Sequence, residues 1–467
     1  MKIKIMNLDL LKIKKAYFIG IKGAGIVAIV QILKSMGIEI AGSDTAEKFF
    51  TDNILAELGI KYSENFSAEN ITDDIDLVIY STAYNEDNNP ELAEAKKREI
   101  RTISYPEILG YLFNQKYGIA VCGTHGKTTA AAMLACALQN AGCDPDAIIG
   151  GRVNSWGHNA LIGKGEYFIA ETDEFQNKLK FYDPKAAILT SCDWDHPDFF
   201  DNFGDYKRAF ADFVARIPKT GFLVVWGDSV STLEVSKSAG GEVLTYGFGE
   251  ECDYRISNVK NLKPVQKFEV FYNDKSLGEF EIKLIGKFNI LNAAAIIAVC
   301  HKLNLDMEKV KEALKNFQGT ARRFEYVGER NGAILIDDYA HHPEEIKATL
   351  QGAREFYAEK NIWAIFHPHT FTRTKAFLEE FSQSFSDADK VIVLDIYGSV
   401  RETQGGVSSQ DLVKLINKYD HDRAEYIPTI PEAAEFLKNK IGENDVVITI
   451  GAGNVWELAE KLTTDLH

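Results

Sequence analysis

The sequence has little positive charge, few cysteines and no long apolar run, and each shortage excludes a class of protein. Its 52 lysines and arginines stand against 68 aspartates and glutamates, a net charge of −16, which argues against general affinity for nucleic acid or an anionic membrane. No stretch approaches the ~18 apolar residues that span a bilayer. The six cysteines form no CxxC pair, so we expect reduced core residues. The amino terminus alternates lysine with apolar residues without a signal-peptide core, and we expect a cytoplasmic protein.

The chain does have the length and composition of a multidomain globular protein. Its 467 residues, 45% of them hydrophobic, predict about three domains of the usual ~100–200 residues each. Apolar strands followed by polar or glycine-rich turns and helices recur throughout, which is typical of doubly wound α/β domains. We predict an α/β protein with a Rossmann-like domain at 1–107, a central P-loop-type domain with a mostly parallel sheet at 108–320, and a Rossmann-like domain at 321–467.

A candidate phosphate loop lies in the segment AVCGTHGKTTAAAML, residues 120–134. The common pattern requires a glycine six places before its lysine, and Val121 stands there instead. The backbone N–H groups between two glycines, at a helix start, can still cradle phosphate. Lys127 would neutralise phosphate charge and the Thr128 hydroxyl would ligate Mg²⁺; the alternative is a glycine turn with an exposed lysine. The nucleotide-binding prediction comprises Gly123, Thr124, His125, Gly126, Lys127, Thr128 and Thr129.

Acidic and imidazole side chains end the next two predicted strands, in the segments AETDE (170–174) and SCDWDHPD (191–198). Because Mg²⁺ on ATP keeps several waters, one carboxylate and one imidazole suffice as protein ligands. Solvated loop acids explain either cluster alone, but behind a Gly-Lys-Thr loop the two clusters form a candidate metal site. Its possible ligands are Glu171, Asp173, Glu174, Asp193, Asp195 and His196.

Two further groups of residues suggest ligand binding. The turn GIKGAG at 20–25 departs from GxGxxG, yet Asp44 lies 44 − 25 = 19 residues beyond it, where an acid commonly meets a ribose hydroxyl. This favours a nucleotide diphosphate over a structural turn. The carboxy-terminal third carries GTARRFE, DDYAHHPEE and FHPHTFTRT. Its histidine pairs lack the spacing of a helical zinc site, so arginine and histidine recognition of phosphates, carboxylates or sugars is the better interpretation.

Together these segments resemble the Mur ligases, and within that family its alanine-adding branch. The resemblance covers nearly the whole chain, from FIGIKGAG and AGSD through GTHGKTT, AETDE, DWDHPD, GKFNILNA, GTARRFE, DDYAHHPEE and PHTFTRT to DIYG and GAGN. It implies that the first domain binds a UDP-sugar, that the central domain binds ATP, and that the third binds the incoming amino acid and closes over the site. GTxGKT is the family's own ATP loop.

The implied reaction is ATP-dependent amide formation through an acyl phosphate, with UDP-N-acetylmuramate and L-alanine as substrates and ATP and Mg²⁺ as cofactors. By this resemblance the catalytic residues are Lys127, Glu171, His196 and Arg323, and the metal ligands are Thr128, Glu171 and His196. ATP would also meet Asn289, Asn292, Arg323 and Asp338. The substrate-binding residues would be Gly20, Lys22, Gly23, Gly25, Ser43, Asp44, His341 and Arg373. We expect a monomer or weak homodimer with no nucleic acid or membrane partner.

Several departures keep other functions open. Phe288 replaces a histidine of the family's adenine-binding helix, and Phe210 and Ala211 stand where other branches carry a carbamylated lysine; the latter agrees with the alanine-adding branch. The segments ETDEFQNKLKFYDPK and DIYGSVRETQGGVSS differ from that branch. The alternatives are a ligase that recycles a murein tripeptide, a folylpolyglutamate synthase-like ligase, a nucleotide-binding regulator without catalysis, and a nicotinamide dehydrogenase.

Overall fold

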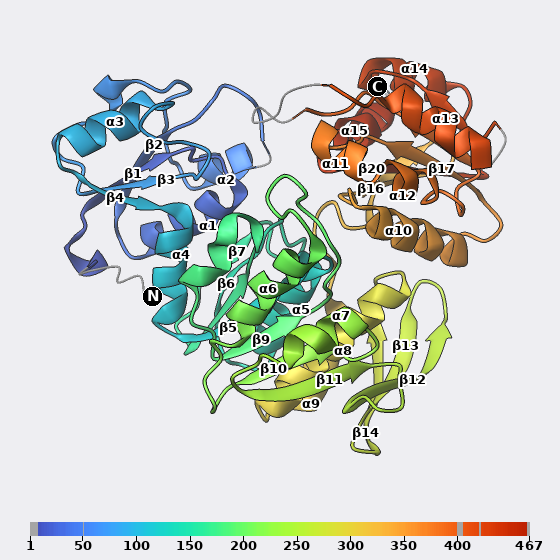
Figure 1. Cartoon of the computed structure of the whole chain (residues 1–467), viewed down its shortest axis with the longest axis horizontal. Helices are drawn as coiled ribbons and strands as arrows, with labels where there is room; N and C mark the ends of the chain where they lie inside the picture. Colours follow the sequence, from blue (N-terminus) through green and yellow to red (C-terminus); the bar gives the residue numbers. More distant parts are fainter. Residues whose placement is uncertain (1–7, 50, 399–404, 420–421, 465–467) are drawn as a thin grey trace.

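Three β-sheets follow one another along the chain in the computed structural model, which describes residues 8–49, 51–398, 405–419 and 422–464. The first and third units lie on either side of the central one (Figure 1). The predicted α/β architecture of three domains with mostly parallel sheets is therefore confirmed. The boundaries at 107 and 320 stay predictions, and helix α4 (Tyr105–Asn114) spans the first of them.

The first sheet has four parallel strands in the order β2-β1-β3-β4. Its strands are β1 (Lys15–Ile19), β2 (Glu39–Ser43), β3 (Leu77–Tyr80) and β4 (Arg101–Ser104). Besides α4, its helices are α1 (Ala24–Ser35), α2 (Thr51–Glu57) and α3 (Pro90–Lys97), with 3₁₀ turns η1 (Leu10–Lys12) and η2 (Ala68–Asn70). The glycine turn joins β1 to α1 at the carboxyl edge of the sheet, where parallel strands commonly present ligand sites.

The central sheet has ten strands in the order β14-β13-β12-β11-β10-β9-β5-β8-β6-β7. Its parallel part contains β5 (Tyr117–Cys122), β6 (Asp146–Ile148), β8 (Tyr167–Glu171), β9 (Ala186–Leu189), β10 (Phe222–Trp226) and β11 (Glu242–Gly247). Edge strand β7 (Ala160–Leu161) is antiparallel to β6. The other elements are α5 (Lys127–Asn140), η3 (Phe175–Phe181), α6 (Phe203–Val214), α7 (Val230–Ser236), α8 (Lys287–Lys302) and α9 (Met307–Asn316).

An antiparallel extension completes the central sheet with β12 (Tyr254–Asn261), β13 (Gln266–Tyr272) and β14 (Lys275–Ile282). Asn273 and Asp274 connect β13 to β14, with φ angles of 47° and 61°. Two successive left-handed residues define the type I′ turn that suits the twist of a hairpin. The hairpin predicted around these two residues is confirmed.

The third sheet has six strands in the order β15-β16-β20-β17-β18-β19, parallel except for β15 against β16. Its strands are β15 (Glu325–Arg330), β16 (Ala333–Asp338), β17 (Asn361–Phe366), β18 (Lys390–Val393), β19 (Ala424–Tyr426) and β20 (Asp445–Ile450). Its helices are α10 (Pro343–Phe356), α11 (Phe371–Ala376), α12 (Leu378–Ser382), α13 (Ser409–Tyr419), α14 (Ile430–Lys438) and α15 (Trp456–Thr464). Strand β16 ends at the segment DDYAHHPEE, which α10 continues.

Apolar side chains from several strands and helices form the cores, and one of them is shared by the first and central units. Within the described ranges, no helix combines the length and apolar character needed to cross a membrane. Residues 1–7, which bear on the signal-peptide expectation, lie outside the described part of the chain. Residues 399–404, inside the altered segment DIYGSVRETQGGVSS, also lie outside it.

Candidate active site

The phosphate loop connects β5 to α5, and two of its glycines are required by geometry. Gly123 has a φ of 130°, and a Cβ there would lie 2.4 Å from the Thr190 hydroxyl. Gly126 has a φ of 77°, and a Cβ would lie 2.7 Å from Oδ1 of Asn292. Both positions combine a left-handed backbone with close neighbours, which only glycine accommodates. The loop therefore turns tightly into the amino end of a helix of 14 residues, as phosphate binding requires.

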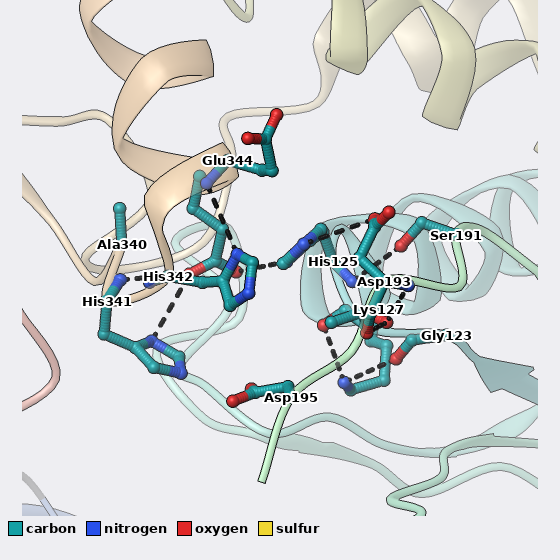
Figure 2. Close-up of polar contacts among 12 residues, drawn as sticks. Gly123, His125, Lys127, Ser191, Asp193, Asp195, Ala340, His341, His342 and Glu344 are labelled. Carbon is teal, nitrogen blue, oxygen red and sulfur yellow. Dashed lines mark hydrogen bonds and ion pairs between the residues drawn. The ribbon is translucent and has the colours of Figure 1, made fainter. Parts of the chain in front are cut away.

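Lys127 folds back over the loop that it follows. Its Nζ donates to the carbonyl oxygen of Gly123 at 2.6 Å (Figure 2) and to that of Thr124 at 3.0 Å, and lies 3.8 Å from Oε2 of Glu174. Burial lowers the lysine pKa, but the surrounding carboxylates, Glu174 first, outweigh it and raise the pKa above its ordinary value. The side chain is therefore a fixed positive charge at the loop.

The Thr128 hydroxyl and the Glu171 carboxylate meet beside the loop. Thr128 donates to Oε1 of Glu171 at 2.9 Å, and the Gly150 N–H donates to Oε2 at 2.7 Å. Arg323, from the segment entering β15, donates to the Thr128 hydroxyl at 3.4 Å. A hydroxyl, a carboxylate and a guanidinium from distant parts of the sequence thus converge on the start of α5.

A second group of possible ligands surrounds His196. Ligand atoms of Asp173, Glu174 and His196 all lie within 4.8 Å of one another. Glu174 is almost fully buried; its Oε1 accepts a hydrogen bond from the Tyr206 hydroxyl at 2.8 Å, whereas its Oε2 has no hydrogen-bond donor among the described residues. The Phe175 ring packs on the imidazole with centroids 4.8 Å apart. This oxygen and nitrogen set suits a hard divalent cation that retains waters.

The third domain contributes a buried cation to the same region. Arg373, in α11, donates from Nε to Oδ1 of Asp195 at 3.0 Å, and its Nη2 also lies 3.0 Å from that oxygen. Burial raises the Asp195 pKa, but Arg373 and then His196 hold it far below its usual range. His341 lies nearby, and burial lowers its pKa to about 3. The site therefore has a neutral imidazole beside a fixed ion pair.

A cavity of about 510 Å³ lies between the central and third domains. Asn289 and Arg323 line it with a mixed polar and aromatic wall that includes Phe317, Phe324 and Tyr326. Asn292 does not line it and packs against Gly126 of the loop instead. Arg323 of its wall also reaches the Thr128 hydroxyl at the start of α5, and the size and lining of the cavity suit a planar base.

Asp338 is held by the backbone next to this cavity. Its two oxygens accept the N–H groups of Phe324 and Ala340, both at 2.8 Å. Burial raises its pKa to about 6, against the opposing effect of Arg323. The side chain therefore shapes the segment that carries Arg323, and its predicted contact with the ribose of ATP stays a prediction.

The predicted sugar-nucleotide residues gather at the carboxyl ends of β1 and β2. Lys22 is buried, and its Nζ donates to the carbonyls of Thr45 and Glu47, both at 2.9 Å, and lies 3.1 Å from Asp52. Asp44 accepts the N–H of Lys22 at 2.7 Å and that of Thr45 at 2.8 Å. These side chains organise the turn itself, which leads into the amino end of α1.

The other members of that set also shape the turn. The Ser43 hydroxyl bonds to the buried Glu91 carboxylate. Gly20 has a φ of 80°, and a Cβ on Gly25 would lie 2.3 Å from the Tyr105 hydroxyl. Gly23 precedes α1 as its N-cap.

Glu174 and Asp195 are named in the sequence-based assignment only as possible metal ligands, and Glu345 has no role in it. All three lie within quoted motifs, but their sequence did not indicate which partners they meet. Glu345 carries a recognisable signal, because a glutamate at the third helical position completes a capping box. Its contact with the phosphate loop has no local signal at all. The altered segment 395–409 is described in part: Tyr397 stacks on the His369 ring with centroids 5.7 Å apart.

Comparisons with known proteins agree over nearly the whole chain. The models for "Mur ligase family, catalytic domain", "Mur ligase middle domain" and "Mur ligase, glutamate ligase domain" match residues 15–117, 121–300 and 322–453. A UDP-N-acetylmuramate–L-alanine ligase of Desulfitobacterium hafniense is 40% identical over 448 residues, 96% of this chain and 98% of the relative. Another, of Caldanaerobacter subterraneus subsp. tengcongensis, is 41% identical over 459 residues, 98% of each.

Solved structures share the arrangement of domains. A UDP-N-acetylmuramate–alanine ligase from Thermotoga maritima matches with a TM-score of 0.81 at 28% identity, over 97% of this chain and 98% of that one. A murein peptide ligase from Psychrobacter arcticus has the same fold, with a TM-score of 0.71 at 22% identity and the same coverage.

Proposed function

The chain belongs to the Mur ligase family, and from this membership we propose that it is an ATP-dependent ligase joining L-alanine to UDP-N-acetylmuramate. The observation that carries the proposal is the phosphate loop whose Thr128 meets Glu171 at 2.9 Å, facing the His196 cluster and closed by third-domain arginines. Relatives named for this reaction cover nearly the whole chain at 40% and 41% identity.

The reaction balances as two displacements. The lactyl carboxylate of UDP-N-acetylmuramate attacks the γ-phosphorus of ATP, the bond to the bridging oxygen breaks, and ADP leaves as an acyl phosphate forms. The amine of L-alanine then attacks the acyl carbon, loses a proton, and expels inorganic phosphate to leave the amide. Two anions meet in the first step, so catalysis is mainly the management of charge. Lys127 and Arg323 supply positive charge at the phosphates.

Two magnesium positions fit the donor set. Thr128 and Glu171 would hold one ion, and His196 the other, with Glu174 and Asp173 beside it. The Glu174 oxygen without a hydrogen-bond donor supports the second position, since a buried carboxylate oxygen that accepts no hydrogen bond costs free energy, which the ion pair with Lys127 at 3.8 Å offsets only in part. When bound, magnesium offsets the negative charge of the phosphates and of the carboxylate.

The remaining residues orient the substrates. Asn289 meets the adenine in the interdomain cavity, and Asn292 supports the loop from behind. The turn at 20–25 binds the diphosphate of the UDP-sugar through the amino end of α1. Arg373 and His341 orient the amino acid or the sugar acid at the third-domain face. Docking of that domain excludes water, which would otherwise hydrolyse the acyl phosphate.

An amine panel tests the proposal. Purified protein with ATP, Mg²⁺ and UDP-N-acetylmuramate should release phosphate when L-alanine is added, and more slowly or not at all with glycine or L-serine. Turnover only with L-Ala-γ-D-Glu-meso-diaminopimelate would instead identify the tripeptide-recycling reaction. Binding of a folate without binding of a UDP-sugar would identify a folylpolyglutamate synthase-like ligase. Absence of turnover with every amine, in a folded sample that binds ATP, would indicate a regulator.

The cellular compartment and the assembly state complete the proposal. ATP and UDP-sugars are cytoplasmic metabolites, so the enzyme works in the cytoplasm. It acts as a monomer or weak homodimer, without nucleic acid or membrane partners, in keeping with its net charge of −16. Sedimentation velocity across a concentration series tests the assembly state, and a stable larger species would contradict it.

A further inference from the structure

One carboxylate of the third domain contacts two domains at once. Glu345 lies in the first turn of α10, and its Oε2 accepts the backbone N–H groups of His341 at 3.0 Å and His342 at 3.3 Å, which caps the helix. Its Oε1 lies 3.1 Å from Nδ1 of His125, 220 residues earlier in the phosphate loop. The two oxygens of one planar group therefore fix the loop relative to α10.

The backbone of His125 is fixed by residues of the central domain. Its N–H donates to the Ser191 hydroxyl at 2.8 Å, and its carbonyl accepts the Thr190 hydroxyl at 2.5 Å. Figure 2 shows the ring between the loop and the start of α10, near His342, with centroids 4.9 Å apart. Nε2 lies 3.5 Å from Asp193 and has no hydrogen-bond partner within the described chain. The Glu345 contact is thus the hydrogen bond that holds this ring.

The charges strengthen the contact. Burial opposes ionisation of Glu345, yet the hydrogen bond and charge of His125 and the charge of Arg323 hold its pKa well below the usual range. Burial also opposes the charge on His125, but the hydrogen bond and charge of Glu345 raise its pKa above the ordinary histidine value. A hydrogen bond between ionised partners is roughly twice as strong as a neutral one.

We propose that Glu345 is a positioning residue that couples docking of the third domain to the shape of the phosphate loop, and so to ATP affinity. The inference rests on the proposed function for its ligand. When α10 withdraws, Oε1 leaves with it and the His125 ring loses its partner. Without this hydrogen bond, the backbone N–H groups of the loop are less well oriented to bind one phosphate together.

The test compares two adjacent glutamates. In Glu345→Gln the amide still caps the helix, because glutamine serves in a capping box as glutamate does, but the charged link to His125 is lost. Glu344→Gln is the matched control: Glu344 is 55% exposed, and among the described residues its side chain pairs with Lys347 alone, at 2.7 Å. AMP-PNP binding with Mg²⁺ is measured by titration calorimetry, and kcat and KM for ATP by phosphate release.

We expect Glu345→Gln to weaken AMP-PNP binding and raise the KM for ATP roughly tenfold, with a smaller change in kcat. Glu344→Gln should stay within about twofold of wild type, and affinity for UDP-N-acetylmuramate should be unchanged in both. A residue that only capped α10 would lower the melting temperature without this split between KM and kcat. Wild-type nucleotide affinity in Glu345→Gln would overturn the inference.

A double-mutant cycle tests the contact from its other end. His125→Asn should weaken AMP-PNP binding by a factor similar to that of Glu345→Gln, and the double variant should be no weaker than the weaker single variant. If the losses in AMP-PNP affinity of the two single variants multiply in the double variant, the coupling is contradicted. The two proposals fail separately: a wild-type protein that binds AMP-PNP in a Glu345-dependent way but makes no alanine adduct contradicts the proposed function alone. If the wild-type protein ligates L-alanine normally but the nucleotide affinity does not depend on Glu345 or His125, this inference alone is contradicted.

Discussion

The Asp195→Asn substitution should show how strongly the buried ion pair holds the third domain in place. Asp195 follows β9 and receives both Nε and Nη2 of Arg373 at 3.0 Å. The two side chains are only 7% and 8% exposed. Asparagine keeps an oxygen that can accept the same hydrogen bonds, so the variant removes the charge and little else. The guanidinium is then buried without its counter-ion.

The magnitude follows from that burial. Removing one partner of a buried ion pair costs about 3–5 kcal/mol, which corresponds to about two to four orders of magnitude at 1.4 kcal/mol per tenfold change. Because the pair joins two domains, Arg373 can regain water when the third domain undocks, so the docking free energy limits the loss. We expect kcat/KM to fall at least about tenfold, with the docked population reduced.

The control is the same change in an exposed pair. Asp183 lies 2.6 Å from Arg216 with side chains 55% and 32% exposed, and such pairs contribute about 0–1 kcal/mol. Phosphate release is measured for Asp195→Asn and Asp183→Asn, with a Mg²⁺ titration to separate the effect from that of neighbouring His196. Limited proteolysis reports docking. If the two variants have equal activity and equal protease resistance, the reasoning about the buried pair is wrong.

Three further outcomes are expected. Lys127→Ala removes the charge at the phosphates and should lower kcat by about two to three orders of magnitude with an unchanged circular dichroism spectrum; a loss below about tenfold would contradict its role. Asn289→Ala should raise the KM for ATP about tenfold and reduce discrimination against GTP. Unchanged selectivity between ATP and GTP would show that adenine does not bind in the interdomain cavity. Burial lowers the pKa of His341 to about 3, so the unfolded chain binds more protons than the folded one between pH 3 and 6.5. The free energy of unfolding should therefore fall as pH drops from 6.5, by about 2 kcal/mol at pH 5.0 for this group. Thermal melting should show a smaller fall in His341→Gln than in the wild type. Equal pH dependence in the two proteins would contradict the lowered pKa of His341.

Much of the fold was predictable because its determinants are local. The glycine turn at 20–25, the loop at 123–126 and the turn at Asn273 and Asp274 each carry a local residue pattern and a positive φ that short-range rules recognise, although distant neighbours such as Thr190 and Asn292 also exclude a side chain from the loop glycines. Alternation of apolar strands and helices likewise predicted three parallel-sheet domains. The placement of Lys127 and Thr128 at a helix start required nothing beyond this pattern.

The sequence by itself thus determined the domains, the phosphate loop and the residue types around it. Only the tertiary structure decided which side chains meet: His125 with Glu345, Asp195 with Arg373, and Glu174 with His196. These partners lie on different elements, so their distances depend on how separately folded units pack. The same packing removes water and places charges beside Asp195, Glu345 and His125, and thereby shifts the pKa values of these three groups, as burial does for His341. Neither effect is encoded in any one segment.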